Sequence, residues 1–202
     1  MEITGLRQIK NNRFELTLET GEQFKVTLND VADFSLYTGR ELTENELDAL
    51  RDAAALSRCK ERAMRIVAVR AMSERELCDR LVEKGETEPN AAATVAWLID
   101  LHILNDADYA AMLVRHYAAK GYGARRIRDE LYRRKVPKEL WDAALDELPE
   151  QGGTIDKLLR SRIRGADPDD RTALKKASDA LLRRGFGWDE IKEAIERYRN
   201  ED

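Results

Sequence analysis

A helical sequence pattern recurs along the chain at a fixed spacing of fifty residues. Leu81, Leu131 and Leu181 hold the same place in its three copies. An apolar residue precedes each leucine by four positions and a basic residue follows it by three, without a gap in the register. A period of this length is typical of small helical units that stack in tandem. The sequence therefore predicts an elongated array of helical repeats that displays side chains at regular intervals.

The first repeat is expected to contain three helices. A capping box at Thr43 and Glu46 predicts the start of two successive helices, or of one long one, with Met64 among its inward-facing residues. A second capping box at Ser73 and Glu76 opens the middle helix, which Gly85 is expected to end. The third helix is expected at about 89–101.

The other two repeats follow the same plan. Asn105 is a good N-cap for the first helix of the second repeat, and Pro137 is expected in the first turn of its third helix, where a missing N–H costs nothing. A linker, Pro149–Gly153, should then lead into the last repeat. Its three helices are expected at 155–163, 168–184 and 188–198.

The N-terminus alternates apolar and polar residues with a period of two, as half-buried strands do. Turn signals at Asn11–Asn12 and at Gly21 separate three such segments. The alternating apolar positions are Phe14, Leu16 and Leu18, then Phe24, Val26 and Leu28. Three short antiparallel strands are expected, and such a sheet needs a cover for its apolar face. Candidates for the cover are Val31, Phe34, Leu36 and Tyr37.

The predicted fold class is therefore mainly α, with tandem three-helix repeats preceded by a small antiparallel β-sheet domain. The expected boundaries are 1–57 for the N-terminal strands and short helices, then 58–104, 105–149 and 150–202 for the three repeats.

Composition agrees with thin, stacked helices that expose much surface. Charged residues make up 37% of the chain, against about 25% in ordinary globular domains. We find no apolar run near 18 residues and no signal-peptide pattern, so a membrane protein is not expected. Two cysteines, Cys59 and Cys78, suit a reducing compartment and predict a cytoplasmic protein, although a disulfide between them stays open as an alternative.

The charge is unevenly placed. The net charge is -4, but residues 1–57 hold 6 basic and 11 acidic side chains, whereas the rest of the chain holds 29 and 28. Residues 113–138 contain nine Arg or Lys against only Asp129 and Glu130. A mild overall charge thus conceals a basic segment that suits an acidic partner or phosphates.

A helical wheel places this basic charge on the outer face of the middle helices. The slots that hold Arg125, Arg126, Asp129 and Arg133 in the second repeat hold Lys175, Lys176, Asp179 and Arg183 in the third. In the first repeat the same slots hold Arg75, Glu76, Asp79 and Glu83, which is mostly acidic. The second and third repeats are therefore expected to offer a basic stripe that the first does not.

Plain solvation is the alternative explanation for such charges. Arginine favours fork-like pairing with carboxylate or phosphate, which solubility alone does not require. Tyr122, beside the stripe, could stack on a base or a partner ring, or could simply pack between helices. Gly121 and Gly123 are interpreted as turn residues, since neither a P-loop nor a GxGxxG pattern surrounds them.

We identify no catalytic constellation, cofactor motif or metal site in the sequence. His102 and His116 lack an HExxH pattern or a cysteine cluster and are interpreted as surface or packing residues. Cys59 and Cys78 are interpreted as small core residues. A non-enzymatic protein without cofactors is therefore expected.

Three stretches resemble the RecX family of recombinase regulators. They are residues 63–85, the segment around Leu104–Asp106, and the Gly-Tyr-Gly…Arg-Ile…Glu-Leu phrase at 121–135. The resemblance covers about residues 58–148, and the last repeat resembles the third repeat of the family more loosely. The N-terminal strands resemble an extension that some members carry. The chain has Lys135–Val136 where the family typically has a Lys-Gly pair.

This resemblance implies binding to the RecA recombinase assembled on single-stranded DNA, and suppression of its ATP hydrolysis, strand exchange and co-protease activity. It also implies a role in regulating recombination, in DNA repair and in the SOS response, for a monomer, and direct contact with single- or double-stranded DNA stays open. The expected partner-binding residues are Tyr122, Arg125, Arg126, Arg128, Arg133, Arg134, Lys175, Lys176 and Arg183.

Two other classes stay open. A three-helix unit with a basic helix could act as a helix-turn-helix DNA-binding protein, although the basic face lacks the Asn and Gln that read adenine. The repeats could also form a scaffold that a protein partner recognises through apolar patches.

Overall fold

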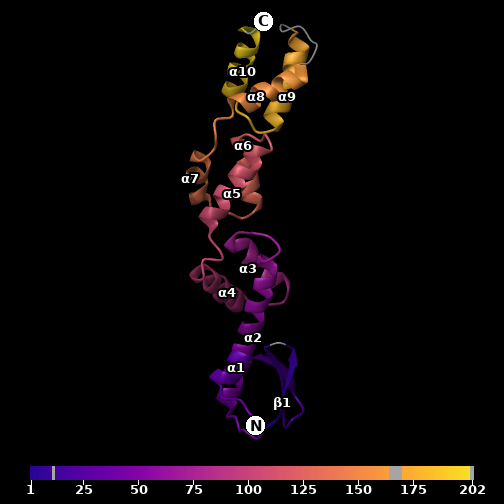
Figure 1. Cartoon of the computed structure of the whole chain (residues 1–202), viewed down its shortest axis with the longest axis vertical. Helices are drawn as coiled ribbons and strands as arrows, with labels where there is room; N and C mark the ends of the chain where they lie inside the picture. The colour runs from indigo at the N-terminus through magenta and orange to yellow at the C-terminus, as the bar shows by residue number, and fades with distance from the viewer. Residues whose placement is uncertain (11, 164–169, 201–202) are drawn as a thin grey trace. The chain divides into compact units, whose positions relative to one another are not determined.

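The structure is a computed structural model of the chain, and it describes residues 1–10, 12–163 and 170–200. In these ranges it is mainly helical, with a three-stranded antiparallel sheet at the N-terminus, as the sequence predicts (Figure 1). Two compact units can be distinguished. The N-terminal unit comprises Met1–Ala71 and Leu77–Ile103, and the C-terminal unit comprises Met72–Glu76 and the described residues from Leu104 on.

The N-terminal unit is built on the strands β1 (Ile3–Lys10), β2 (Arg13–Leu18) and β3 (Gln23–Thr27), in that spatial order. Both pairs are antiparallel, and Leu16 lies opposite Leu6 on one side and Phe24 on the other. The turn between β1 and β2 was predicted at Asn11–Asn12, and Asn11 lies outside the described residues.

A hydrophobic core forms between this sheet and the helix α2 (Glu44–Val67). Leu16, Leu18 and Val26 of the sheet and Leu47 and Leu50 of the helix are among its buried residues. The alternating pattern thus predicted the buried face of the sheet correctly, because successive side chains of a strand point to opposite faces.

The segment after β3 departs from the prediction in two places. Leu28 is not a strand residue but opens the helix α1 (Leu28–Asp33) and is 46% exposed. A capping box causes this, since the Thr27 side chain accepts a hydrogen bond from the Asp30 amide and the Asp30 carboxylate accepts one from the Thr27 amide. Leu36 is buried in the core as predicted, but Tyr37 is 60% exposed and does not cover the sheet.

The helix α2 is one continuous helix of 24 residues, which opens at the predicted capping box between Thr43 and Glu46. Met64 was expected to face inward but is 40% exposed. Beyond the sheet, α2 packs against α4 (Glu88–Asp100), and this second contact buries Cys59 and Ala63 instead. The buried line therefore shifts around the helix along its length.

The first repeat continues with α3 (Glu74–Glu83) and α4. As predicted, Gly85 follows α3 with a positive φ of 88°. At the start of α3 the Ser73 hydroxyl accepts a hydrogen bond from the Glu76 amide at 3.1 Å. Both cysteines are free, with Cys59 buried and Cys78 half-buried, so they do not form the disulfide that the sequence left open.

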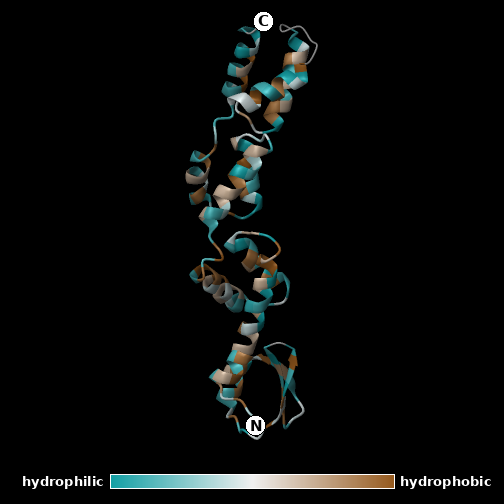
Figure 2. Ribbon diagram, viewed as in Figure 1, coloured by the Kyte–Doolittle hydropathy of each residue, from teal (hydrophilic) through white to brown (hydrophobic). Residues whose placement is uncertain are grey.

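The C-terminal unit contains the helices of the second and third repeats. They are α5 (Asp106–Ala119), α6 (Ala124–Arg133), the 3-10 turn η1 (Lys138–Leu140) and α7 (Trp141–Asp146), then α8 (Gly152–Ile163), α9 (Arg171–Arg183) and α10 (Trp188–Asn200). Two hydrophobic clusters stabilise them, one around Ile127 and Leu131 and one around Leu181 and Phe186. These helices carry brown and teal residues side by side in Figure 2, as amphipathic helices do.

Two predicted boundaries in this unit need correction, and a third lies outside the described residues. Pro137 has an extended ψ of 136° and precedes a 3-10 turn, so it does not lie inside a first helical turn. The linker predicted up to Gly153 ends earlier, because α8 begins at Gly152 and the Gln151 carbonyl accepts a hydrogen bond from the Ile155 amide. The middle helix of the last repeat was expected from Pro168, which lies outside the described residues; the helix that is described begins at Arg171.

Lys135 occupies the left-handed position that ends the middle helix of the second repeat. Its φ is 56°, and it stands fifty residues from Gly85 and from Gly185, which have φ values of 88° and 89°. The amides after it bond back in the same way, with Val136 N–H donating to the Leu131 carbonyl as Phe186 N–H does to Leu181. The helix therefore ends in the same way as in the other two repeats, although Lys135 stands where they have Gly85 and Gly185.

We expect Lys135→Gly to raise the free energy of unfolding by about 0.5–1 kcal/mol, because a side chain in the left-handed region costs roughly 1–2 kcal/mol and glycine returns part of this gain as unfolded-state entropy. Urea denaturation followed by circular dichroism measures the change. The matched control is Lys138→Gly, in the 3-10 turn nearby, which should destabilise. A loss of stability in Lys135→Gly would contradict the assignment.

Candidate functional site

The outer side of α6 carries four of the eight basic residues that the sequence selected. Arg125, Arg128 and Arg133 are exposed, and Arg126 is half-buried. Ile127 and Leu131 are fully buried on the opposite side. The amphipathic pattern of this ten-residue helix fixes that orientation, since residues three and four apart share a face. We call Arg125, Arg126, Arg128 and Arg133 the α6 basic face.

A buried carboxylate holds part of this face in place. Glu130 is only 6% exposed, and it pairs with Arg133 at 3.1 Å and with Arg126 at 3.5 Å. Arg128 lies 3.9 Å from the exposed carboxylate of Asp142. Because a buried charge must be compensated, Arg126 and Arg133 stabilise the helix as well as displaying charge. Arg125 and Arg128 are the members of the face that the fold itself needs least.

The helix α9 presents the matching residues of the third repeat. Lys175, Lys176 and Arg183 are all exposed, whereas Leu174, Ala177 and Leu181 are buried in the core of that repeat. We call Lys175, Lys176 and Arg183 the α9 basic face. An Asp170 side chain caps the helix by accepting hydrogen bonds from the Thr172 and Ala173 amides.

In every repeat, an exposed apolar residue lies on the outer face of the middle helix, beside the charged residues. The sequence analysis did not identify these residues. Val82, Tyr132 and Leu182 follow the three buried leucines directly, and they are 36%, 68% and 36% exposed. At 100° per residue, Tyr132 falls between Arg125 and Arg128 on the wheel. The fifty-residue register contained this signal, since the three residues occupy one slot.

A shallow cavity of about 390 Å³ lies beside Tyr132. Its lining residues are Arg128, Asp129, Tyr132, Arg133, Lys138 and Trp141. Two aromatic rings next to three cations can bind an acidic group together with a planar or apolar one. This combination suits a protein side-chain cluster or a nucleotide.

Tyr122 and Arg134 are placed differently from the basic faces. The Tyr122 ring lies 6.0 Å from the Tyr117 ring, and the Arg184 guanidinium lies 5.7 Å above it. Arg134 is half-buried and hydrogen-bonds Tyr117. Burial works to lower the pKa of Arg134, but Tyr109, Tyr117 and Glu76 together hold it above its usual value. Both residues are thus engaged within the C-terminal unit, which favours the packing alternative for Tyr122.

The Gly121–Gly123 segment forms a junction between the second and third repeats. Gly121 has a φ of 74°, as a tight turn requires, and its carbonyl accepts a hydrogen bond from Arg184 at 3.2 Å. The Gly123 amide donates to the Arg184 carbonyl at 2.9 Å, and the Arg125 amide donates to the Gly185 carbonyl at 3.1 Å. The end of α9 therefore satisfies two of the amides at the start of α6. We call these contacts the repeat junction.

The same contact occurs one repeat earlier with different chemistry. The Ser73 hydroxyl donates a hydrogen bond of 2.6 Å to the Arg134 carbonyl. Ser73 and Gly123 occupy one slot of the repeat, as do Arg134 and Arg184. Both glycines were interpreted as turn residues, which is correct for Gly121. Gly123 is instead the N-cap of α6, with a φ of −83°, and it allows the close approach of the two repeats.

A buried carboxylate lies next to this earlier contact. Asp106 is 6% exposed, its Oδ1 accepts a hydrogen bond from the Glu74 amide at 2.9 Å, and its Oδ2 has no hydrogen-bond partner among the described residues. Burial raises the pKa of Asp106. Burial, and then repulsion from Asp106, also raise the pKa of Glu74.

A carboxyl whose pKa is raised in the folded state contributes stability that is complete below its unfolded pKa and is lost as pH rises through the folded value. We therefore expect the unfolding free energy of the unmodified chain, relative to Asp106→Asn, to fall by about 1 kcal/mol as pH rises from about 4 to about 7. Urea denaturation at four pH values measures this difference. A difference that stays constant, or that grows with pH, would show that the carboxyl is not strained by burial.

Two further findings concern the expected absence of other sites. Among residues 1–10, 12–163 and 170–200, no group of three His, Cys, Asp or Glu side chains is arranged to hold a metal ion, and His102 and His116 are exposed. Within the same ranges, no helix combines the length and the apolar character needed to cross a membrane.

Comparison with known proteins covers all three repeats. Models of the first, second and third three-helix domains of RecX match residues 59–98, 105–145 and 153–195. The chain is 36% identical over 144 residues to the regulatory protein RecX of Stenotrophomonas maltophilia strain R551-3, which covers 70% of this chain and 87% of the relative. It is 34% identical over 165 residues to that of Cronobacter sakazakii, covering 76% and 98%.

Solved structures show the same fold. A crystal structure of a regulatory protein RecX matches with a TM-score of 0.78 at 22% identity, over 97% of this chain and 98% of that one. RecX from Lactobacillus salivarius matches with a TM-score of 0.66 at 24% identity, over 72% and 97%. The family resemblance of the sequence is confirmed, and this chain belongs to the RecX family of regulatory proteins.

Proposed function

We propose that this chain is a non-enzymatic, cytoplasmic regulator that binds a RecA recombinase assembled on single-stranded DNA and inhibits its ATP hydrolysis, strand exchange and co-protease activity. Membership in a family of regulatory proteins supports the class of function. The observation that carries the binding mode is the agreement between the α6 and α9 basic faces, which display cations at the same slots of two repeats.

The chemistry of these faces suits a filament of protein and nucleic acid. Arginine binds carboxylates and phosphates through paired hydrogen bonds, and lysine supplies point charges that need no fixed orientation. Tyr132 and Leu182, at a neighbouring position of the same two repeats, add apolar contact. A partner that offers repeated acidic groups would be bound by both repeats at once, which multiplies the effect of each contact.

The test is ATP hydrolysis by the recombinase on single-stranded DNA, measured with increasing amounts of this chain as a monomer. We expect the hydrolysis rate to fall as the chain is added, and the inhibition to weaken as salt is raised from about 50 to about 200 mM, because the contacts are largely ionic. An unchanged hydrolysis rate at a several-fold excess of this chain over the recombinase would refute the proposed function.

Direct DNA binding is the second candidate, and the aromatic side chains next to cations in the cavity beside Tyr132 favour it. The helix α6 has no Asn or Gln with which to read adenine, so binding should be independent of sequence. Binding of labelled duplex and single-stranded DNA in the absence of recombinase tests this candidate. Sequence-independent binding with a slope near −0.9 per phosphate contact in a plot of log affinity against log salt would exclude a sequence-reading helix-turn-helix protein.

A further inference from the structure

A cationic cavity lies in the N-terminal unit, and none of the residues that the sequence selected lines it. Its volume is about 590 Å³. Its lining residues are Arg62, Arg65, Ile66, Val69, Arg70, Arg80 and Lys84. Five of these seven carry a positive charge and none is acidic. The concentration of charge is unexpected in a repeat whose outer slots are mostly acidic.

The two helices that line the cavity explain why the sequence reading missed it. Arg62, Arg65 and Ile66 lie three and four residues apart on one side of α2. Arg80 lies on α3, and Lys84 directly follows the last residue of that helix. At 100° per residue both fall outside the arc that holds Asp79 and Glu83. Only the folded unit brings the two sets of cations together.

One of the arginines is held in place by a buried partner. Glu86 is 5% exposed and lies 2.7 Å from the Nε of Arg62 and 3.6 Å from Arg58. The carboxylate is buried on the protein side, so it orients Arg62 and compensates part of its charge. Arg65, Arg80 and Lys84 also line the cavity, where they can face a ligand.

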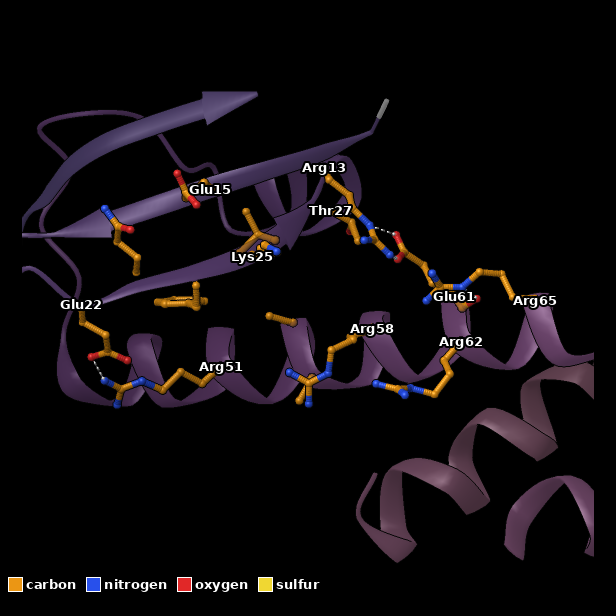
Figure 3. Close-up of a pocket in the computed structure, with 15 residues that line it drawn as sticks. Arg13, Glu15, Glu22, Lys25, Thr27, Arg51, Arg58, Glu61, Arg62 and Arg65 are labelled. Atoms are coloured by element: carbon orange, nitrogen blue, oxygen red, sulfur yellow. Dashed lines mark hydrogen bonds and ion pairs between the residues drawn. The ribbon is translucent and has the colours of Figure 1, made fainter. Parts of the chain in front are cut away.

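The neighbouring cavity provides a contrast. It lies between the sheet and α2, has a volume of about 680 Å³, and shares Arg62 and Arg65 with the cationic one. Figure 3 shows that carboxylates close both of its ends, with Glu61 paired to Arg13 and Glu22 paired to Arg51. Three carboxylates thus offset half of its six cations, whereas the lining of the cationic cavity contains no acidic residue.

The uncharged residues that line the cationic cavity favour an acidic peptide over a nucleic acid as its ligand. Val69 is 84% exposed, and Ile66 is half-buried beside it. The lining contains no aromatic ring on which a base could stack and no amide or hydroxyl side chain that could read a base edge. Aliphatic groups among cations instead match a peptide that carries both carboxylates and an aliphatic side chain.

We propose that this cavity binds an acidic segment of a partner protein, with carboxylates on Arg65, Arg80 and Lys84 and an aliphatic side chain on Ile66 and Val69. The cavity shares no residue with the α6 and α9 basic faces, and the proposal does not depend on their role. It gives the N-terminal unit a binding function of its own, directed at an acidic and aliphatic protein segment.

The experiment measures fluorescence anisotropy of a labelled twelve-residue peptide of alternating Glu and Leu, titrated with the full chain. A peptide of twelve Glu and a twelve-nucleotide oligothymidylate are the comparison probes. We expect the Glu-Leu peptide to bind most tightly. Arg65→Glu with Arg80→Glu should weaken its binding at least about 30-fold, and the corresponding double lysine variant should keep most of it, because charge rather than fork geometry dominates.

Two controls separate the site from general electrostatics. Lys157→Glu with Arg162→Glu, on exposed positions of α8, makes the same change in net charge and should alter binding less than about threefold. Val69→Ser should weaken the Glu-Leu peptide about three- to tenfold and leave the Glu peptide unchanged. Equal losses in both charge variants, an insensitive Val69→Ser, or tighter binding of oligothymidylate that Arg65→Glu with Arg80→Glu abolishes would each overturn the proposal.

Discussion

Reversing one exposed cation on α6 and one on α9 is expected to abolish most of the inhibition of the recombinase. In Arg125→Glu with Lys175→Glu, each substitution replaces an attraction by a repulsion at the same slot of two repeats. Loss of a charge contact at an interface costs about 1–3 kcal/mol, so two reversals should raise the concentration for half-maximal inhibition at least about 100-fold. ATP hydrolysis on single-stranded DNA is the measurement.

The choice of positions follows from the ion pairs. Arg126 and Arg133 compensate the buried Glu130, so their reversal would damage the fold and the binding face together. Arg125 and Lys175 are exposed, and reversal there should leave the helical circular dichroism unchanged. Lys157→Glu with Arg162→Glu on α8 is again the control with the same change in net charge. Equal inhibition by the unmodified chain and by Arg125→Glu with Lys175→Glu would refute the role of the basic faces.

A smaller variant tests the apolar slot in the same assay. Tyr132→Ser removes an exposed ring and no charge, and we expect it to weaken inhibition about three- to thirtyfold, as loss of an aromatic contact at an interface does. Leu182→Ser is the counterpart in the third repeat and should have a smaller effect, since less of its side chain is exposed. No effect of Tyr132→Ser would limit the binding face to its charges.

The helices and the sheet were largely predictable because each depends on local patterns. The apolar period of α6 and α9, the period of two in β2 and the capping box at Thr43 all lie within short windows of sequence. The errors fall where one local signal overrides another, as the Thr27 capping box overrides the strand pattern at Leu28. A second packing partner also shifts the buried face of α2, which the sequence does not show.

The candidate sites were predictable only in part. The exposed positions of Arg125, Lys175 and their neighbours follow from the wheel, whereas the place of Arg134 against Tyr117 depends on packing between helices. The cationic cavity is lined by residues of both α2 and α3, and no sequence pattern within either helix predicts it. Contacts between repeats are hidden for the same reason, although the Ser73–Arg134 and Gly123–Arg184 pairs have the same separation in sequence.

We expect Gly185→Ala, at the repeat junction, to lower the free energy of unfolding by about 2–4 kcal/mol. Gly185 has a φ of 89°, and an added Cβ would overlap the backbone of Arg126 at the start of α6. Gly123 meets the same constraint from the other side, since a Cβ there would lie 2.5 Å from the Gly185 carbonyl oxygen. Neither backbone can move away without breaking the hydrogen bonds from Gly123 and Arg125 to the end of α9.

Substitutions at two other glycines separate the two causes of this loss, which are backbone strain and steric overlap between the repeats. Gly85→Ala introduces the same left-handed strain, with a φ of 88°, but nothing lies within 4 Å of the new Cβ, so it should cost only about 1 kcal/mol. Gly153→Ala, in the first turn of α8, meets neither strain nor contact and should stabilise by up to about 1 kcal/mol. Urea denaturation of the three variants measures their free energies of unfolding and so ranks them by stability. If Gly185→Ala cost no more than Gly85→Ala, the close approach of the two repeats would be excluded, because strain alone would then account for the whole loss.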